Sequence, residues 1–181
     1  MKRMFIAGKI SSDLTNKILR YQAQHQYFPQ AWIHAKNLHI TLIPPFNAKN
    51  EKIQNIKTIL EKITKESPSL SFVCTNIELN NTENPRVLWL SLEKNKGLEE
   101  LKQSIEKSLL ISPDSRPFHP HITVGRIRTQ NAHFFSKYWK QEKIKWTNIL
   151  DTIVIMESHL RSDGADYDIV YSFPLQKILT S

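Results

Sequence analysis

The chain of 181 residues is short of cysteine and of long apolar runs, and each shortage excludes a class of protein. Cys74 is its single cysteine, so an internal disulfide is impossible and nothing indicates an oxidising compartment. No apolar run approaches the roughly 18 residues that cross a bilayer, so we expect no membrane partner. The basic start of the chain lacks the apolar core of a signal peptide, and we therefore expect a cytoplasmic protein.

Acidic residues are also in deficit. Asp and Glu number 17 against 25 Lys and Arg, which gives a formal net charge of +8. A positive surface favours polyanionic partners such as RNA, although lysine-rich surfaces also serve solubility alone. The length suits one domain over residues 1–181, and no obligate protein partner is indicated.

The spacing of apolar residues predicts alternating strands and helices. The strands are expected at residues 4–9, 38–43, 70–79, 86–92, 119–127, 146–158 and 167–173. The helices are expected from Ser11 or Ser12 to Phe28, at 49–66, at 98–109 and, as a short one, at 131–140. Pro44 and Pro45 are expected to end the second strand, and residues 163–166 to form a hairpin turn before the last one.

Each half of the chain follows the order strand, helix, strand, helix, strand. Such a repeat without close sequence identity favours two lobes related by an approximate twofold axis. The predicted fold class is therefore α+β, with two pseudo-symmetric lobes of antiparallel sheet backed by helices around a central groove.

One four-residue pattern occurs twice, 82 positions apart (121 minus 39): His39-Ile40-Thr41-Leu42 and His121-Ile122-Thr123-Val124. Alternate residues of a strand point to the same face, so each copy puts its histidine and threonine on one face and two apolar residues on the other. Two copies facing each other place two imidazoles and two hydroxyls around one small, phosphate-sized cavity.

Paired histidines suit a reaction in which one proton is removed and another is delivered. An imidazole with a pKa near 6.5 can be held protonated or neutral around pH 7, and a neighbouring hydroxyl donates a hydrogen bond without adding charge. A single His-x-Thr is most often an ordinary half-exposed strand. Two copies, each on a predicted strand and each bounded by a proline, favour a catalytic site.

With these residues, the chain resembles the two-histidine phosphoesterase superfamily, and within it the RNA 2',3'-cyclic phosphodiesterases formerly called 2'-5' RNA ligases. The resemblance covers nearly the whole chain. It rests on the segments MFIAGKI, LHITLIPPF, RPFHPHITVGR and TIVIMESHLRSDGADYDIVYSFPL. Many relatives continue the first motif with Arg-Phe-Leu-Gly, where this chain has Ile43-Pro44-Pro45-Phe46.

The resemblance implies hydrolysis of a 2',3'-cyclic phosphate to a 2'-phosphomonoester, without a metal or other cofactor. The expected substrate is an RNA end of this kind or a related cyclic nucleotide. It implies that His39 is the general acid that protonates the departing 3' oxygen, and that His121 is the general base that deprotonates the attacking water. The residues alone do not distinguish the acid from the base. Thr41 and Thr123 would hold the non-bridging oxygens.

The resemblance also makes Arg126 a phosphate partner, since a guanidinium fork matches two phosphate oxygens. Simple strand alternation puts Arg126 on the face of Ile122 and Val124, opposite His121. A bulge at Gly125 would redirect the arginine towards the histidine. The alternative is a solvent-facing arginine at the end of a strand.

Three further residues are weaker candidates for substrate binding. Arg116 could contact the phosphate, and Phe118 and Phe46 could stack on a base, although packing explains both phenylalanines equally well. His119 and His121 could chelate zinc together with His39 or His133, but no carboxylate or thiol nearby completes a familiar ligand set. The tryptophans are expected in the core or between the lobes: Trp32, Trp89, Trp139 and Trp146.

Two other functions share the same motifs. One is a basic RNA-binding module that holds a terminal phosphate without turnover. The other is 2'-5' ligation, the reverse chemistry, in which a 2',3'-cyclic end meets a 5'-hydroxyl.

Overall fold

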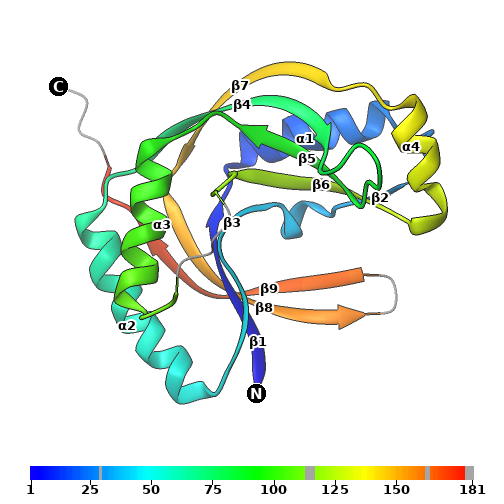
Figure 1. Cartoon of the computed structure of the whole chain (residues 1–181). Coiled ribbons are helices and arrows are strands. Elements are labelled where there is room, and N and C mark those ends of the chain that lie inside the picture. The colour runs from blue at the N-terminus through cyan, green and yellow to red at the C-terminus, as the bar shows by residue number, and fades with distance from the viewer. Residues whose placement is uncertain (29, 113–116, 162–163, 178–181) are drawn as a thin grey trace.

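The computed structural model of the chain describes residues 1–28, 30–112, 117–161 and 164–177 (Figure 1). Its helices are α1 (Ser12–Gln24), α2 (Asn50–Glu66), α3 (Lys96–Ser108) and α4 (Ala132–Tyr138), with short 3-10 turns η1 (Ala35–Asn37) and η2 (Thr129–Asn131). Its strands are β1 (Lys2–Lys9), β2 (Gln30–Trp32), β3 (His39–Ala48), β4 (Leu70–Leu79), β5 (Val87–Leu92), β6 (His121–Ile127), β7 (Glu142–Leu150), β8 (Thr152–Arg161) and β9 (Gly164–Pro174).

The strands of this described part form one curled sheet in which every paired neighbour is antiparallel. The strand order is β7-β4-β5-β6-β3-β1-β8-β9, and β2 also pairs with β6. The two motif strands, β6 and β3, are direct neighbours and join one half of the sheet to the other. The predicted α+β class, with antiparallel halves backed by helices, is confirmed.

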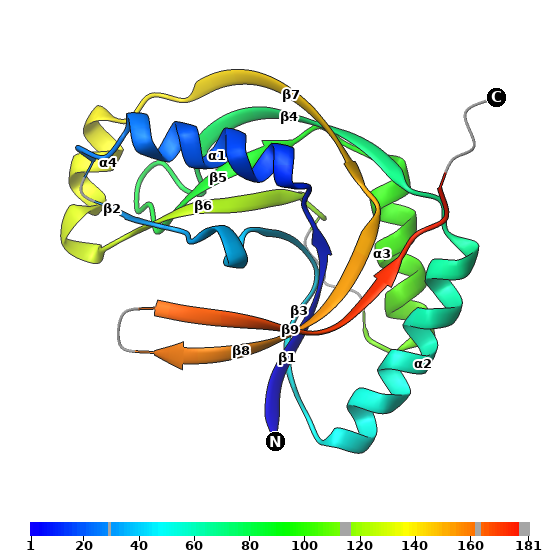
Figure 2. The ribbon, with the colours of Figure 1, turned by 180° about the vertical axis from the view of Figure 1, so that it is seen from behind.

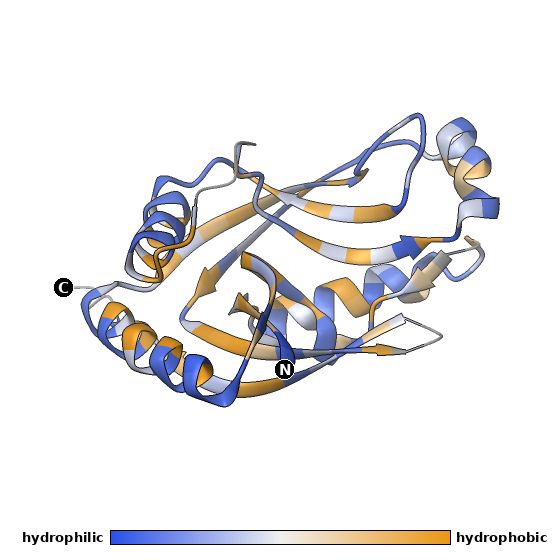
Figure 3. Ribbon diagram, turned by 60° about the horizontal axis from the view of Figure 1, so that its bottom comes forward, coloured by the Kyte–Doolittle hydropathy of each residue, from blue (hydrophilic) through white to orange (hydrophobic). Residues whose placement is uncertain are grey.

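The helices cover the sheet with amphipathic faces. Helices α2 and α3 pack together at one end of the molecule, and α4 lies at the other end (Figures 1 and 2). The buried stripe of α2 consists of Ile53, Ile56, Leu60 and Ile63, and the alternation of apolar and polar residues along helices and strands is visible in Figure 3. Among the described residues, no helix is both long and apolar enough to span a membrane.

The first motif strand was predicted to end at Pro44 and Pro45, and this prediction was wrong. Strand β3 continues through Pro44 and Pro45 to Ala48. Ile43 pairs with Ile6 of β1 and Phe46 pairs with Met4, so β3 has one extra residue between these pairs. A bulge tolerates proline because the bulged residue makes no regular ladder hydrogen bond.

Other elements also differ from the prediction. The segment expected as one strand, 146–158, is two strands that meet at Asp151, where the chain reverses from β7 to β8. Helix α1 ends at Gln24 rather than Phe28. The short strand β2 was not predicted, because its three residues carry too little periodicity and form a strand only by pairing with β6. The hairpin turn predicted at residues 163–166 is wrong for residues 164–166, which belong to β9 and pair with residues 159–161 of β8. Residue 163 lies outside the described residues.

Candidate active site

The two motifs meet at the junction of β3 and β6. Ile40 pairs with Ile122 in the antiparallel ladder, so His39 lies beside Thr123 and Thr41 lies beside His121 on the opposite face. Diagonal neighbours in such a pair are about 7–8 Å apart, which sets the separation of the two histidines. Both apolar partners in the ladder are fully buried, whereas the histidines and threonines are half-buried. The alternation of the sequence therefore produces a packed face and a polar face.

The two imidazoles are held in the same way. Nδ1 of His39 lies 2.7 Å from the carbonyl oxygen of Asn37, and Nδ1 of His121 lies 2.8 Å from the carbonyl oxygen of His119. A carbonyl only accepts, so each Nδ1 carries the hydrogen and each Nε2 is left to exchange a proton. Nε2 of His39 lies 3.1 Å from the hydroxyl of Thr41.

Burial lowers the pKa of both histidines. The pKa of His39 falls to about 4, chiefly because its ring is removed from water, with further lowering by the charges of His121 and Arg126, while the carbonyl of Asn37 opposes the shift. The pKa of His121 is lowered by burial and by the charge of His119, and the bond to the His119 carbonyl opposes this. The effect of the His121 charge on His39 shows that the two imidazoles lie close enough to interact electrostatically.

Different aromatic rings surround the two histidines. The imidazole of His121 lies flat on the indole of Trp89, with ring centroids 4.0 Å apart and an angle of 25° between the planes. His39 has Phe5 at 4.9 Å and 46°, and Tyr167 at 5.4 Å and 81°. Trp89, which was expected to be a core or interface residue, is thus in direct contact with a motif histidine.

Arg126 reaches the same face through a bulge in β6. In the ladder with β5, Thr123 pairs with Trp89 and Gly125 pairs with Leu88, so Val124 is the extra residue. The bulge reverses the alternation from this point and turns the Arg126 side chain away from the core. Its guanidinium donates a long hydrogen bond of 3.4 Å to the hydroxyl of Tyr167.

A cavity of about 180 Å³ lies on this face. Its lining is Phe5, Ile33, Asn37, His39, Thr41, Pro45, Thr123, Arg126 and Tyr167. His121 does not line it, but its neighbour on the strand face, Thr123, does. The cavity thus gathers one motif histidine, both motif threonines and the arginine.

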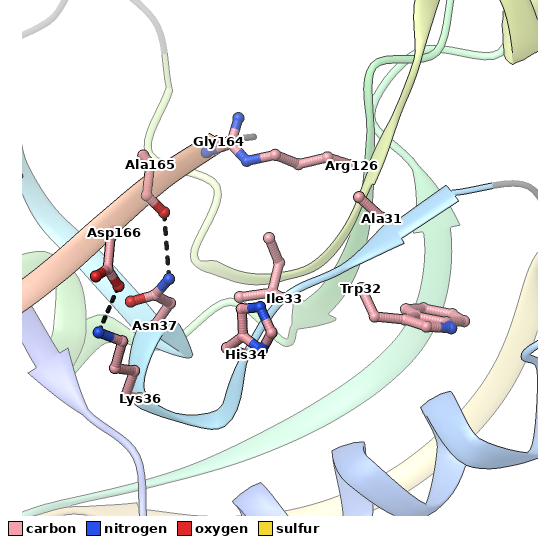
Figure 4. Close-up of a pocket in the computed structure, with 10 residues that line it drawn as sticks. All are labelled: Ala31, Trp32, Ile33, His34, Lys36, Asn37, Arg126, Gly164, Ala165 and Asp166. Atoms are coloured by element: carbon pink, nitrogen blue, oxygen red, sulfur yellow. Dashed lines mark hydrogen bonds and ion pairs between the residues drawn. The ribbon is translucent and has the colours of Figure 1, made fainter. Parts of the chain in front are cut away.

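A larger cavity of about 480 Å³ adjoins the first one, and the two share Ile33, Asn37 and Arg126. It lies between the β2–η1 segment and the start of β9, and Arg126 extends across it towards Gly164 (Figure 4). Lys36 forms an ion pair of 2.6 Å with Asp166 at its rim. Arg126 is therefore common to the lining of both cavities.

Asn37 links the β8–β9 hairpin to His39, a role that the sequence did not indicate. Its buried amide donates to the carbonyl of Ala165 at 3.2 Å and accepts from the backbone of Tyr167 at 3.1 Å, while its own carbonyl holds His39. These contacts span about 130 positions of sequence, which no local pattern reports. The only signal available was its position two residues before the motif histidine.

Of the three weaker candidates, Phe46 and Phe118 lie outside this group. Phe46 lines a separate apolar cavity and lies under the ammonium of Lys52, 5.6 Å from the ring centroid. Phe118 packs against the core and lies under Lys102, also at 5.6 Å. Arg116 lies outside the described residues. Where the structure describes the chain, no three His, Cys, Asp or Glu side chains are grouped as metal ligands would be.

The fold and this site define a class. A profile of the 2'-5' RNA ligase superfamily matches residues 11–161, most of the chain. The chain belongs to this superfamily, and its relatives assign it to the phosphoesterase class of enzymes.

Particular relatives refine the comparison. The chain is 33% identical over 176 residues to an RNA 2',3'-cyclic phosphodiesterase of Bacillus subtilis (strain 168), covering 94% of this chain and 95% of the relative. An enzyme with the same description from Thermotoga maritima is 26% identical over 171 residues, covering 90% and 86%. Among solved structures, E. coli LigT complexed with 3'-AMP has a TM-score of 0.75 at 21% identity, covering 97% of this chain and 98% of LigT.

Proposed function

We propose that this protein hydrolyses 2',3'-cyclic phosphate ends of RNA to 2'-phosphomonoesters by metal-independent acid–base catalysis with two histidines. The observation that carries the proposal is the pairing of β3 with β6, which brings two His-x-Thr units onto one face beside Arg126. The relatives described as RNA 2',3'-cyclic phosphodiesterases support the substrate class.

In the proposed reaction, a water oxygen attacks the phosphorus of the cyclic ester. Nε2 of His121 takes a proton from that water, and the bond between phosphorus and the 3' oxygen breaks. Nε2 of His39 gives its proton to the departing 3' oxygen. The products are a 2'-phosphate and a 3'-hydroxyl, and the exchange of protons leaves His121 charged and His39 neutral.

The different surroundings of the two histidines support this division of roles. Burial and the charge of Arg126 make protonated His39 a strong acid, which favours donation to the leaving oxygen. In the free enzyme a pKa of about 4 leaves this ring neutral at pH 7. The negative phosphate must therefore raise the pKa of His39 when it binds, because an opposite charge nearby favours the charged form.

The remaining polar groups are suited to the growing negative charge. Thr41 and Thr123 line the cavity from adjacent strands, so their hydroxyls can donate to the two non-bridging oxygens. The guanidinium of Arg126 supplies a fixed positive charge that is never lost at working pH. These donors act without adding a titratable group to the site.

The adjoining cavity gives the rest of the nucleotide a place to bind. We assign the ribose and its cyclic phosphate to the 180 Å³ cavity and the attached base to the 480 Å³ cavity. The net charge of +8 favours an RNA chain over a neutral ligand. With one buried thiol, Cys74, the protein is also suited to a reducing cytoplasm, where we propose that it acts as a single domain without an obligate protein partner.

The test is to incubate purified protein with an RNA oligonucleotide that ends in a 2',3'-cyclic phosphate, in excess EDTA, and to identify the product end. A 2'-phosphomonoester formed at full rate in EDTA is the expected result. A 3'-phosphate would exclude the proposed bond cleavage, and activity only with added metal would exclude the proposed mechanism.

The same assay separates the alternatives. Tight binding of the cyclic end without any product indicates an RNA-end-binding module. A joined strand, formed when an RNA with a 5'-hydroxyl is added, indicates ligation. Either result as the sole activity would replace hydrolysis as the function.

A further inference from the structure

Trp89 occupies the polar face of β5 although its neighbours in sequence are core residues. Leu88 and Leu90 are fully buried, so alternation turns the indole to the opposite face, where it is half-buried. In the ladder, Trp89 pairs with Thr123 and Ser91 pairs with His121. Trp89 and His121 are therefore diagonal neighbours, which allows their rings to stack at 4.0 Å.

We propose that Trp89 is a positioning residue for the reaction: its indole face fixes the plane of the His121 imidazole and stabilises the positive charge that this ring gains when it takes the proton from water. This inference rests on the proposed function. The inference goes beyond the proposed function because it assigns a role to a residue outside both motifs.

The stacking has two physical consequences. The hydrogen bond from Nδ1 to the His119 carbonyl fixes one edge of the imidazole, and the indole fixes the plane, so Nε2 keeps one direction. The face of an indole also carries negative partial charge, and tryptophan is the strongest side-chain partner for a cation. A base that becomes charged in the transition state is stabilised at the moment when the charge forms.

His39 does not have this arrangement. Its aromatic neighbours, Phe5 and Tyr167, stand at 46° and 81° to its ring rather than flat against it. A group that gives up its positive charge during the reaction gains nothing from a partner that stabilises that charge. The contrast between the two rings matches the opposite changes of charge that they undergo.

A plain covering role for Trp89 makes the opposite prediction. Burial is the main cause that lowers the pKa of His121. If the indole of Trp89 only excluded water, its removal would therefore raise this pKa. An indole that stabilises the imidazolium would lower it when removed. The other charged groups facing this region are His39, His119, Arg126 and, through Ser91, Glu78, and the substitution changes none of them.

The experiment compares three variants of the full chain: Trp89→Leu, Trp89→Phe and, as a matched control, Trp146→Leu, which removes a partly buried tryptophan of β7 outside the site. The pKa of the His121 imidazole is measured by NMR titration, and kcat and KM are measured with a cyclic-phosphate oligonucleotide. We expect Trp89→Leu to lower the pKa by about half a unit to one unit and kcat by about 10-fold, with KM changed less than about 3-fold. Trp89→Phe should retain most of both properties.

The outcomes separate the two proposals. A pKa of His121 that rises or stays constant in Trp89→Leu, or a fall in kcat no larger than in Trp146→Leu, overturns the role of Trp89. A wild-type protein without hydrolytic activity overturns the proposed function, while the NMR titration still decides whether the indole stabilises the imidazolium.

Discussion

The pKa of His39 makes the stability of the folded protein depend on pH. The ring titrates near pH 4 in the folded state and near 6.5 in an unfolded chain, so the unfolded chain binds more protons between these values. The stabilisation is complete above about pH 6.5 and is lost as the pH falls towards 4. At pH 4.5 the difference amounts to about 2.5 kcal/mol at most, and because the ring is only half-buried we expect about 1 to 2.5 kcal/mol.

The perturbation is the substitution His39→Gln, which removes the titrating group. The free energy of unfolding is measured by urea denaturation at several values between pH 7 and pH 4.5, for the wild type, for His39→Gln and for the exposed control His133→Gln. The wild type and the control should lose stability together on acidification, whereas His39→Gln should lose about 1 to 2.5 kcal/mol less. Parallel curves for all three proteins would refute the desolvation of His39.

The other predictions concern turnover. Thr41→Ala and Thr123→Ala should each lower kcat by about 10- to 100-fold. A serine at either position should retain most of the wild-type kcat, because serine keeps the hydroxyl. Equal defects in the alanine and serine variants would count against hydroxyl donation. Arg126→Ala should lower kcat/KM by about 100-fold. Arg126→Lys should lower it less, since lysine keeps the positive charge but not the two-pronged guanidinium. Wild-type kinetics in Arg126→Ala would show that Arg126 is not part of the site. The profile of kcat/KM against pH should be bell-shaped with its optimum below pH 6.5, because burial lowers the pKa of both histidines. An optimum above pH 7.5 would contradict these shifts.

Local patterns were sufficient for the parts of the fold that depend on short segments. The alternation in the two motifs correctly separated the buried Ile40 and Ile122 from the polar residues beside them. The stripe of isoleucines in α2 likewise predicted its buried face. In both cases the residues that form the element themselves show which of its faces is buried.

Features that depend on the pairing register between strands could not be predicted from the sequence. Proline suggested the end of β3, yet pairing with β1 carries the strand through a bulge at Pro44 and Pro45. Trp89 was expected in the core or between the lobes, and only the pairing of β5 with β6 brings it onto His121. The bulge near Gly125, by contrast, was anticipated because Arg126 would otherwise have pointed into the core.

The assignment of His39 as the general acid and His121 as the general base can be tested with a cyclic substrate in which sulfur replaces the bridging 3' oxygen. A thiolate leaves without a proton far more readily than an alkoxide, since thiols are the stronger acids. With the normal substrate, His39→Ala and His121→Ala should each lower the single-turnover rate by about 10²- to 10⁴-fold. With the sulfur substrate, His39→Ala should recover most of the wild-type rate and His121→Ala should keep its full defect; equal defects of His39→Ala on both substrates would contradict its assignment as the acid.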